Sequence, residues 1–348
     1  MKKVVLAFDS FKGCISAQEA CESCAQGVRE AWQNAVVVQV PLSDGGEGLV
    51  ECVRRMLPTR SVAVEVHGPL MDMVEAEYAI SADGKTAYME MAAASGLTLV
   101  PPERRNPLKA TTYGVGEMIA DAVKRGCHEI VMGIGGSATC DGGRGMVEAL
   151  DDCRCLDMDC QVIAACDVNN PLFGKNGAAY VFAPQKGATP EQVETLDGRL
   201  RAFAKATEQA GRATPELAFS SGAGAAGGLG YALLAYLNAN LHSGIDIMLD
   251  IAGFDAAIKD ADLVITGEGK SDEQTLMGKV PYGVLKRCRK ANIPVWLLSG
   301  MIDDATGRLA ESFDLVRSIN EGDNRPLSVL MQPDVAKQNL KERVMLEI

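Results

Sequence analysis

The sequence predicts an α/β protein built on a flavodoxin-like doubly wound parallel sheet, with an inserted second α/β domain that contains antiparallel strands. Three observations support this fold class. Short apolar runs alternate with helical patterns at both ends of the chain, these runs number five, and the part between them contains segments that alternate strictly between apolar and polar residues. The 348 residues also exceed the roughly 250 to 300 at which a single core stops growing, so two domains are expected.

The amino-terminal part is predicted to form strand, helix, strand and helix in turn. Residues 3–8 are an apolar run typical of a buried strand, and residues 16–32 repeat apolar side chains at helical spacing behind the N-cap residue Ser16. Residues 35–42 form a second β-branched run, and residues 49–56 again have helical spacing. The chain therefore opens as β-α-β-α.

The middle of the chain has a different pattern. Three alternating segments within residues 61–91 are separated by Gly68-Pro69 and Asp83-Gly84, which is typical of an antiparallel meander. The pattern then predicts helices and strands in turn: a helix over 113–125, a strand over 129–134, a helix over 145–150, a strand over 161–166 and a long helix over 190–211.

The carboxyl-terminal part returns to short buried strands separated by helices. The strands are predicted over residues 263–266, 294–298 and 315–318, with helices over 281–290 and near 306. Together with the two strands at the amino end they make five, the number in a flavodoxin-like sheet. We therefore expect one discontinuous domain of residues 1–59 and 254–348, and an inserted domain of residues 60–253.

Composition excludes several classes of partner. Acidic residues outnumber basic ones by 46 to 34, and the resulting net charge of -12 repels nucleic acids and anionic membrane surfaces. A small anionic substrate is compatible with this charge, because helix ends, lysines and Mg²⁺ can reverse the field within a cleft. No membrane span or signal peptide is expected either, since no 18 apolar residues run together and the first apolar run is short. The sequence thus predicts a cytoplasmic protein.

The eleven cysteines are predicted to be reduced thiols. Their number is odd, they are scattered, and a chain of this length needs no disulfides for stability. Cys21 and Cys24 form a C-x-x-C pair, but they lie inside a helical pattern and no second pair of ligands follows. A structural zinc site is therefore the weaker interpretation.

The loops that follow the strands of the first domain contain acids, lysines and glycines. In an open parallel sheet these loops meet at one edge, where ligands bind. Glycine lets backbone N–H groups approach a phosphate, lysine neutralises it, and carboxylates hold Mg²⁺ or accept a proton, as phosphoryl transfer requires. Ordinary turn chemistry is the alternative for any single loop. The loops begin at Asp9, Asp44, Gly267 and Ser299.

The inserted domain contains a glycine-rich loop between a predicted strand and a predicted helix. Residues 133–143 include five glycines, a density that packing alone explains poorly, so the loop is expected to wrap a triphosphate. Residues 111–114 offer hydroxyl and N–H groups to an anion, although helix capping accounts for them equally well.

Two other motifs resemble nucleotide-binding motifs but lack features that those motifs require. Residues 222–227 satisfy G-x-G-x-x-G, but no convincing strand precedes them, so an NAD-dependent dehydrogenase is a weak alternative. Gly269-Lys270-Ser271 ends like a Walker A motif, yet Val264 occupies the position of its first glycine.

Taken together, nine motifs in order resemble the bacterial glycerate kinases of the glycerate 2-kinase type. They begin at Asp9 (DSFKG), Ser43 (SDGGEG), Met89 (MEMAAASGL), Arg105 (RNPL), Thr111 (TTYG), Gly133 (GIGGSAT), Phe182 (FAPQKGATP), Gly222 (GAGAAGG) and Ile265 (ITGEG). The resemblance implies transfer of a phosphoryl group from ATP, with Mg²⁺, to D-glycerate, most often at its 2-hydroxyl.

The resemblance also suggests roles for particular residues. Asp44 or Asp272 would be the catalytic base, with the other helping to place Mg²⁺, and Lys12 and Lys279 would screen the phosphoryl charge. The remaining expectations are D-glycerate at Asp9, Ser10, Arg105, Asn106, Thr111 and Thr112, the nucleotide at Gly133, Gly135, Gly136, Ser137, Asp141 and Gly142, and the metal at Asp167 and Glu268. The expected partners are D-glycerate and ATP, and a homo-oligomer is left open.

The sequence departs from the family pattern in several places. The stretch between Leu150 and Cys160 is shorter than in such kinases, Cys140 replaces a common Asn, and Asn169 replaces a common Asp. Ser271 replaces a larger apolar residue. A relative that binds a hydroxy acid or nucleotide with impaired catalysis is therefore the alternative function.

Overall fold

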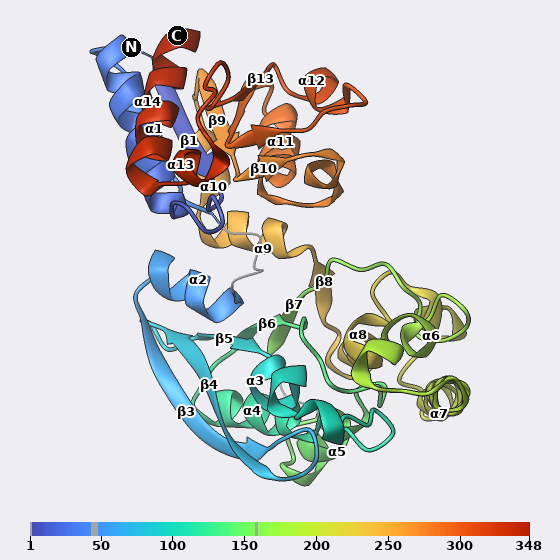
Figure 1. Cartoon of the computed structure of the whole chain (residues 1–348). Coiled ribbons are helices and arrows are strands. Elements are labelled where there is room, and N and C mark those ends of the chain that lie inside the picture. The colour runs from blue at the N-terminus through green and yellow to red at the C-terminus, as the bar shows by residue number, and fades with distance from the viewer. Residues whose placement is uncertain (1, 43–47, 157–158) are drawn as a thin grey trace. The chain divides into compact units, whose positions relative to one another are not determined.

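The computed structural model describes residues 2–42, 48–156 and 159–348 (Figure 1). It divides into two compact units: unit 1 contains Met1–Glu47 and Ile245–Ile348, and unit 2 contains Gly48–Gly244. These boundaries differ from those predicted. Helix α2 (Leu49–Met56) contacts the sheet of unit 2, whereas helix α9 (Gly244–Ile251) buries Ile245 and Leu249 in the core of unit 1.

Unit 1 is built on a five-stranded parallel sheet in the order β2-β1-β9-β11-β13. This is the strand order of a flavodoxin-like doubly wound sheet, so the predicted fold class is confirmed. Its strands are β1 (Lys3–Phe8), β2 (Val36–Gln39), β9 (Leu263–Gly267), β11 (Val295–Ser299) and β13 (Leu315–Ser318).

The central strand β1 is buried on both faces. Val4 and Leu6 belong to the cluster of α1 (Ala17–Ala31) and α14 (Pro333–Glu347), while Val5 and Ala7 belong to the cluster on the other face. A continuous apolar run is therefore required here, as in other parallel sheets with helices on both sides. The remaining elements of unit 1 are α10 (Phe254–Ile258), α11 (Val280–Lys290), α12 (Arg308–Ser312), α13 (Leu327–Leu330) and the short parallel pair β10 (Lys270–Ser271) and β12 (Met301–Ile302).

Unit 2 contains a six-stranded mixed sheet in the order β3-β4-β5-β6-β7-β8. The first three strands form the predicted antiparallel meander, and β5 to β8 run parallel. The strands are β3 (Thr59–His67), β4 (Met73–Ser81), β5 (Thr86–Glu90), β6 (Glu129–Gly133), β7 (Gln161–Ala165) and β8 (Asn240–His242).

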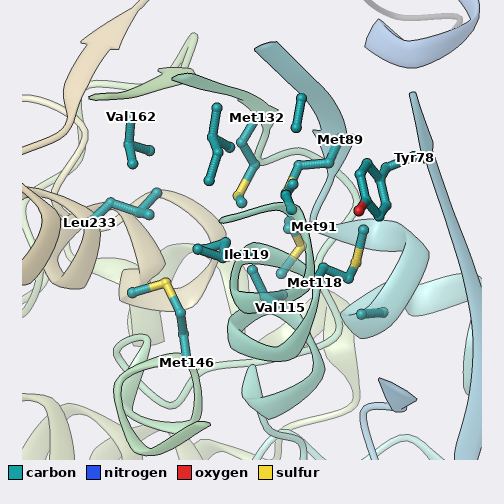
Figure 2. Close-up of a cluster of buried hydrophobic side chains, with 14 of the residues drawn as sticks. Tyr78, Met89, Met91, Val115, Met118, Ile119, Met132, Met146, Val162 and Leu233 are labelled. Carbon is teal, nitrogen blue, oxygen red and sulfur yellow. The ribbon is translucent and has the colours of Figure 1, made fainter. Parts of the chain in front are cut away.

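Methionines fill much of the main core of unit 2. Met89, Met91, Met118, Met132 and Met146 are all buried in one cluster (Figure 2). Their unbranched side chains fit the irregular space where helices cross a sheet. The helices of unit 2 other than α2 are α3 (Ala92–Ser95), α4 (Tyr113–Lys124), α5 (Arg144–Asp152), α6 (Ala178–Phe182), α7 (Pro190–Gln209) and α8 (Ala225–Leu237).

Within the described residues, no helix has the length and apolar character needed to cross a membrane. All eleven cysteines lie in this part of the chain, and none is paired in a disulfide. Cys21 and Cys24 are buried on α1, where burial raises the pKa of the Cys21 thiol to about 12.

Candidate active site

A pocket of about 560 Å³ lies at the carboxyl edge of the sheet in unit 1. The loops that follow β1, β9 and β11 all line it, as the strand order requires. Five of the predicted site residues therefore come together here: Asp9, Ser10, Lys12, Glu268 and Lys279.

Two glycines let these loops pack closely. A Cβ on Gly269 would lie 3.3 Å from the backbone N of Lys12, and a Cβ on Gly300 would lie 2.6 Å from the carbonyl O of Gly269. Larger residues would push the loops after β1, β9 and β11 apart. Glycine at these positions thus shapes the pocket.

Glu268 is the best-positioned acid of the pocket, with only 6% of its surface exposed. Its Oε1 accepts hydrogen bonds from Ser271 Oγ at 3.0 Å and Thr275 Oγ1 at 2.6 Å, and its Oε2 lies 3.5 Å from Lys279 Nζ. Ser271 Oγ also lies 2.8 Å from Ser299 Oγ. A buried carboxylate is stable only with such partners, and here they hold it rigidly.

Asp272 has a capping role and also contacts two lysines. It caps the 3₁₀ helix Glu273–Met277, because its Oδ1 accepts from the backbone N of Gln274 at 3.0 Å. Its carboxylate oxygens also lie 3.8 Å from Lys279 Nζ and 3.5 Å from Lys270 Nζ. The structure thus joins Asp272 to the charge network of Glu268, while Asp44, the other candidate base, lies outside the described residues.

Asp9 directly follows the central strand β1 and lines the same pocket. Its side chain is 4% exposed, and its Oδ1 accepts from the backbone N of Ser10 at 2.7 Å. Asp9 and Glu268 therefore present two carboxylates to one cavity.

In unit 2, the glycine-rich loop after β6 divides into two parts. Gly135 and Gly136 are exposed, and a Cβ on Gly135 would meet no atom within 4 Å. Gly142 is buried instead, with positive φ and a Cβ position 3.0 Å from Phe203. Gly143 also has positive φ, and its Cβ would lie 2.4 Å from that of Ala232. Only the first part of the loop is open to a ligand, whereas the second part is packed.

Asp141 holds this loop to the start of α4. Its Oδ2 accepts from Thr112 N at 2.8 Å, Thr112 Oγ1 at 2.9 Å and Gly145 N at 3.2 Å, and its Oδ1 accepts from Gly143 N at 3.1 Å. Thr111 Oγ1 reaches the same Oδ2 at 3.5 Å. Thr112 is the N-cap residue of α4, but its side chain makes no capping bond to that helix. Thr111 and Thr112 are instead bound to Asp141, which connects them to the glycine-rich loop.

Lys186 lies within one of the family motifs, but no role was predicted for it from the sequence. It is 3% exposed, and its Nζ donates to Ser137 Oγ at 2.6 Å and to the carbonyl O of Thr139 at 2.7 Å. Burial lowers the pKa of Lys186 to about 8, with Cys140 and Asp141 acting in the opposite direction. The buried Lys186 side chain fixes the loop at Ser137 and Thr139. Ser137 is therefore part of the internal support of the loop.

The predicted substrate residues Arg105 and Asn106 line a second pocket, of about 460 Å³, in unit 2. Asn106 Oδ1 accepts from the backbone N of Leu108 at 3.1 Å. Arg105 Nε is buried and has no hydrogen-bond partner among the described residues. Because Arg105 also lines this pocket, its charge can attract a carboxylate there, and its predicted role remains a prediction.

Further acids and amides lie at the carboxyl ends of the parallel strands of unit 2. Asp167 Oδ1 accepts from the backbone N of Gly244 at 2.9 Å, and Asn169 Oδ1 accepts from Ser221 Oγ at 2.6 Å. Glu90, which the sequence analysis did not single out, ends β5, and its Oε1 accepts from Leu49 N at the start of α2 at 3.2 Å. The roles predicted for Asp167 remain predictions.

The glycines of the G-x-G-x-x-G segment are packing residues. A Cβ on Gly224 would lie 2.2 Å from the carbonyl O of Pro171, and one on Gly227 would lie 2.0 Å from that of Thr139. The element before them is the 3₁₀ helix Pro215–Phe219, whereas the dinucleotide fingerprint follows a strand. The segment therefore lacks the context of a dinucleotide site.

The fold and these strand-end side chains define an α/β protein with a candidate ligand site at the carboxyl edge of a doubly wound sheet. The chain matches the model of the Glycerate kinase family over residues 4–159 and 153–347. It is 43% identical over 329 residues to the glycerate kinase of Halalkalibacterium halodurans, and the match covers 87% of this chain and 86% of that protein. It is also 42% identical over 332 residues to the glycerate 2-kinase of Escherichia coli K12, and this match covers 88% of this chain and 87% of that protein.

A solved structure gives the same result. The chain aligns with the crystal structure of a protein assigned as glycerate kinase 2 from Salmonella typhimurium LT2, with a TM-score of 0.81, 40% identity, and coverage of 99% of this chain and 97% of that one. The chain therefore belongs to the glycerate kinase family, and it is a kinase. The two matched segments overlap at residues 153–159, within the stretch that the resemblance predicted to be shorter than in the family.

Proposed function

We propose that this kinase transfers the γ-phosphoryl group of ATP to the 2-hydroxyl of D-glycerate, giving 2-phospho-D-glycerate and ADP. Its similarity to the Escherichia coli glycerate 2-kinase supports the choice of acceptor. The observation that carries the proposal is the pocket of unit 1, in which Asp9, Lys12, Glu268 and Lys279 lie together. Carboxylates beside lysines in one cavity are what a phosphoryl-transfer centre needs.

In this reaction a carboxylate accepts the hydroxyl proton as the acceptor oxygen bonds to the γ-phosphorus. The bond from that phosphorus to the bridging oxygen of ADP breaks at the same time. Asp272 and Asp44 are the proposed bases. Asp272 is held by its capping bond to Gln274 and by Lys270 and Lys279, so its oxygens are oriented before substrate arrives. Lys12 and Lys279 stabilise the charge on the phosphoryl oxygens.

The residues present also fit Mg²⁺. Kinases hold this ion with one or two carboxylates together with phosphate oxygens and water, and both Asp9 and Glu268 line the pocket. Among the residues that the structure describes, no group of three His, Cys, Asp or Glu side chains forms a dedicated cage. Bound with ATP, Mg²⁺ would neutralise charge on the phosphates.

In unit 2, the proposed contacts are to anionic groups. Arg105 and Asn106 are proposed to hold the carboxylate of D-glycerate, and the exposed Gly135 and Gly136 to offer backbone N–H groups to phosphate. Thr111 and Thr112 act through Asp141, which fixes the loop.

The test measures ADP release from ATP and Mg²⁺ with D-glycerate, with L-glycerate and without acceptor, and phosphorus NMR assigns the product. We expect release that depends on D-glycerate and a 2-phosphate product. Glu268→Gln should lower kcat by about 100-fold or more, as expected for loss of a rigid catalytic charge. Folded protein that binds ATP but releases no ADP would support the impaired relative instead, and a 3-phosphate product would overturn the assigned hydroxyl.

A further inference from the structure

The pocket of unit 1 has an apolar part that phosphoryl transfer does not explain. Three of its large apolar residues are conspicuously exposed: Met301 at 46%, Leu327 at 60% and Met331 at 41%. Leu330 and Phe11 also line it. Exposed apolar side chains gathered around one concave site indicate that an apolar surface covers them when the site is filled.

From this arrangement we infer that the pocket binds the nucleoside part of the phosphoryl donor, with its base against the apolar residues of α13 and β12. The inference rests on the proposed function for the identity of the donor. It assigns the base and ribose to unit 1 alone, whereas the sequence analysis placed the nucleotide on the glycine-rich loop of unit 2.

Size and chemistry favour a nucleoside over the acceptor. A cavity of about 560 Å³ lies in the range of pockets for drug-sized ligands. D-Glycerate is a three-carbon anion with polar groups on every carbon, so it gains nothing from Leu327 or Met331. The faces of a purine, by contrast, are planar and apolar.

The topology of the sheet points to the same place. Strand β1 pairs with β2 on one side and with β9 on the other, so the order of strands reverses between β1 and β9. Doubly wound sheets bind their ligands at this reversal, because the loops on its two sides diverge and leave a crevice. Lys12 follows β1 and Gly269 follows β9, and both line the pocket.

One wall carries fixed polar groups. Ser318 Oγ and Asn320 Nδ2 both donate to the carbonyl O of Gly300, at 3.0 and 2.8 Å, and Asn339 Nδ2 donates to Asn320 Oδ1 at 2.7 Å. Each group keeps capacity for a further hydrogen bond. They can therefore recognise the edge of a base or a ribose hydroxyl without reorganisation.

Charged residues complete the site. Lys12, Lys270 and Lys279 line the same cavity. A purely apolar ligand would gain nothing from three lysines, whereas the phosphates of a nucleotide require them. One cavity thus provides apolar, polar and cationic surfaces for the three parts of a nucleotide.

Cys14 provides a test in the unmodified protein. This partly exposed thiol lines the pocket, and Cys153 and Cys166, equally intermediate in exposure, lie in unit 2 as internal controls. The rate of N-ethylmaleimide addition to each thiol is followed by peptide mass spectrometry with adenosine, ADP or D-glycerate. We expect adenosine and ADP to slow the reaction of Cys14 at least fivefold and to leave both controls unchanged, with no effect of D-glycerate.

A matched pair of variants tests the apolar part. Leu327→Asp places a charge against the base, and Leu346→Asp makes the same change at a leucine of unit 1 that is 75% exposed and does not line the pocket. Loss of one apolar contact should raise the KM for ATP about tenfold in the first variant only, with the KM for D-glycerate unchanged.

The outcomes separate the inference from the proposed function. Turnover of ATP with no protection of Cys14 and equal KM values in both variants would overturn the nucleoside site and leave the function intact. Protection of Cys14 by ADP in protein that does not phosphorylate D-glycerate would support the nucleoside site and reject the acceptor. Neither turnover nor protection would reject both.

Discussion

At the scale of single residues, the site depends on buried charges held by hydroxyl groups. Glu268 is held by Ser271 and Thr275 in unit 1, and Lys186 is held by Ser137 and the carbonyl of Thr139 in unit 2. Removing the partner of a buried charge destabilises the fold by more free energy than the hydrogen bond itself contributed, because the charge stays buried without solvation by water. Both groups should therefore be sensitive to substitution of their partners.

Lys186 makes the stability of the protein depend on pH. Its pKa is about 8 in the folded protein and ordinarily 10.5, so between these values the unfolded chain binds more protons. Stability should rise with pH across this window, by at most about 1.4 kcal/mol per pH unit, and this contribution should be absent in Lys186→Met. Urea unfolding at pH 7.5, 9 and 10 measures it, with Lys175→Met, at an exposed lysine, as the control. Parallel pH curves for wild type and Lys186→Met would contradict this.

Ser271, which the resemblance predicted to replace a larger apolar residue of the family, lies beside Glu268. Its hydroxyl contacts both Glu268 and Ser299, and it is fully buried. Ser271→Ala should lower the free energy of unfolding by about 2 kcal/mol, since one hydrogen bond to a buried carboxylate is lost. Denaturant titration measures the loss, and Ser61→Ala, at an exposed serine, should leave stability unchanged.

At the scale of elements, candidate site residues lie in the turns after the strands, and glycines decide which parts of these turns stay open. The loop after β6 shows both uses, because Gly135 faces open space and Gly143 packs against α8. One loop therefore has an open part and a packed part.

Alanine substitutions should separate these two parts. Gly143→Ala would bring its Cβ to 2.4 Å from Ala232 at a φ of +79°, so we expect a loss of about 2 kcal/mol or more. Gly135→Ala meets nothing within 4 Å and should change stability by less than about 0.5 kcal/mol. Thermal and urea unfolding of both variants check this, and equal stabilities would show that the packing account is wrong.

Elements with a clear hydrophobic pattern could be predicted, and the others could not. The strand over 3–8 and the helix over 49–56 match the structure because each has a single apolar run or face. Helix α8 was missed because it is apolar on all sides and contains left-handed residues at Ala226 and Gly227. The strand-end rule predicted that Asp9, Lys12 and Glu268 lie close together, and they line one pocket. Lys186 was not assigned a role, since only tertiary packing brings it to Ser137, 49 positions away.

At the scale of the whole molecule, two separate cores bury most thiols, so thiol reactivity reports on both units. Cys21, Cys24 and Cys288 are buried in unit 1 and Cys140 in unit 2, and burial raises the pKa of each.

Labelling of all thiols should follow burial. At pH 8 we expect Cys14, Cys153, Cys160 and Cys166, which are partly exposed, to react with a maleimide first, and the four buried thiols above at least tenfold more slowly. In denaturant all eleven should react at similar rates. Mass spectrometry of native protein over time measures the order, and early reaction of Cys24 or Cys140 would show that the corresponding core is open.

The pairing of β1 with β9 has a consequence for how the chain is made. Thr266 Oγ1 donates to the carbonyl O of Ala7, 259 positions earlier, so the two neighbours at the centre of the sheet are separated by the whole of unit 2. During synthesis, β1 and β2 leave the ribosome long before their partner exists, whereas unit 2 is complete as soon as residue 244 has emerged. We therefore expect unit 2 to fold first on the nascent chain and the beginning of the protein to finish folding last.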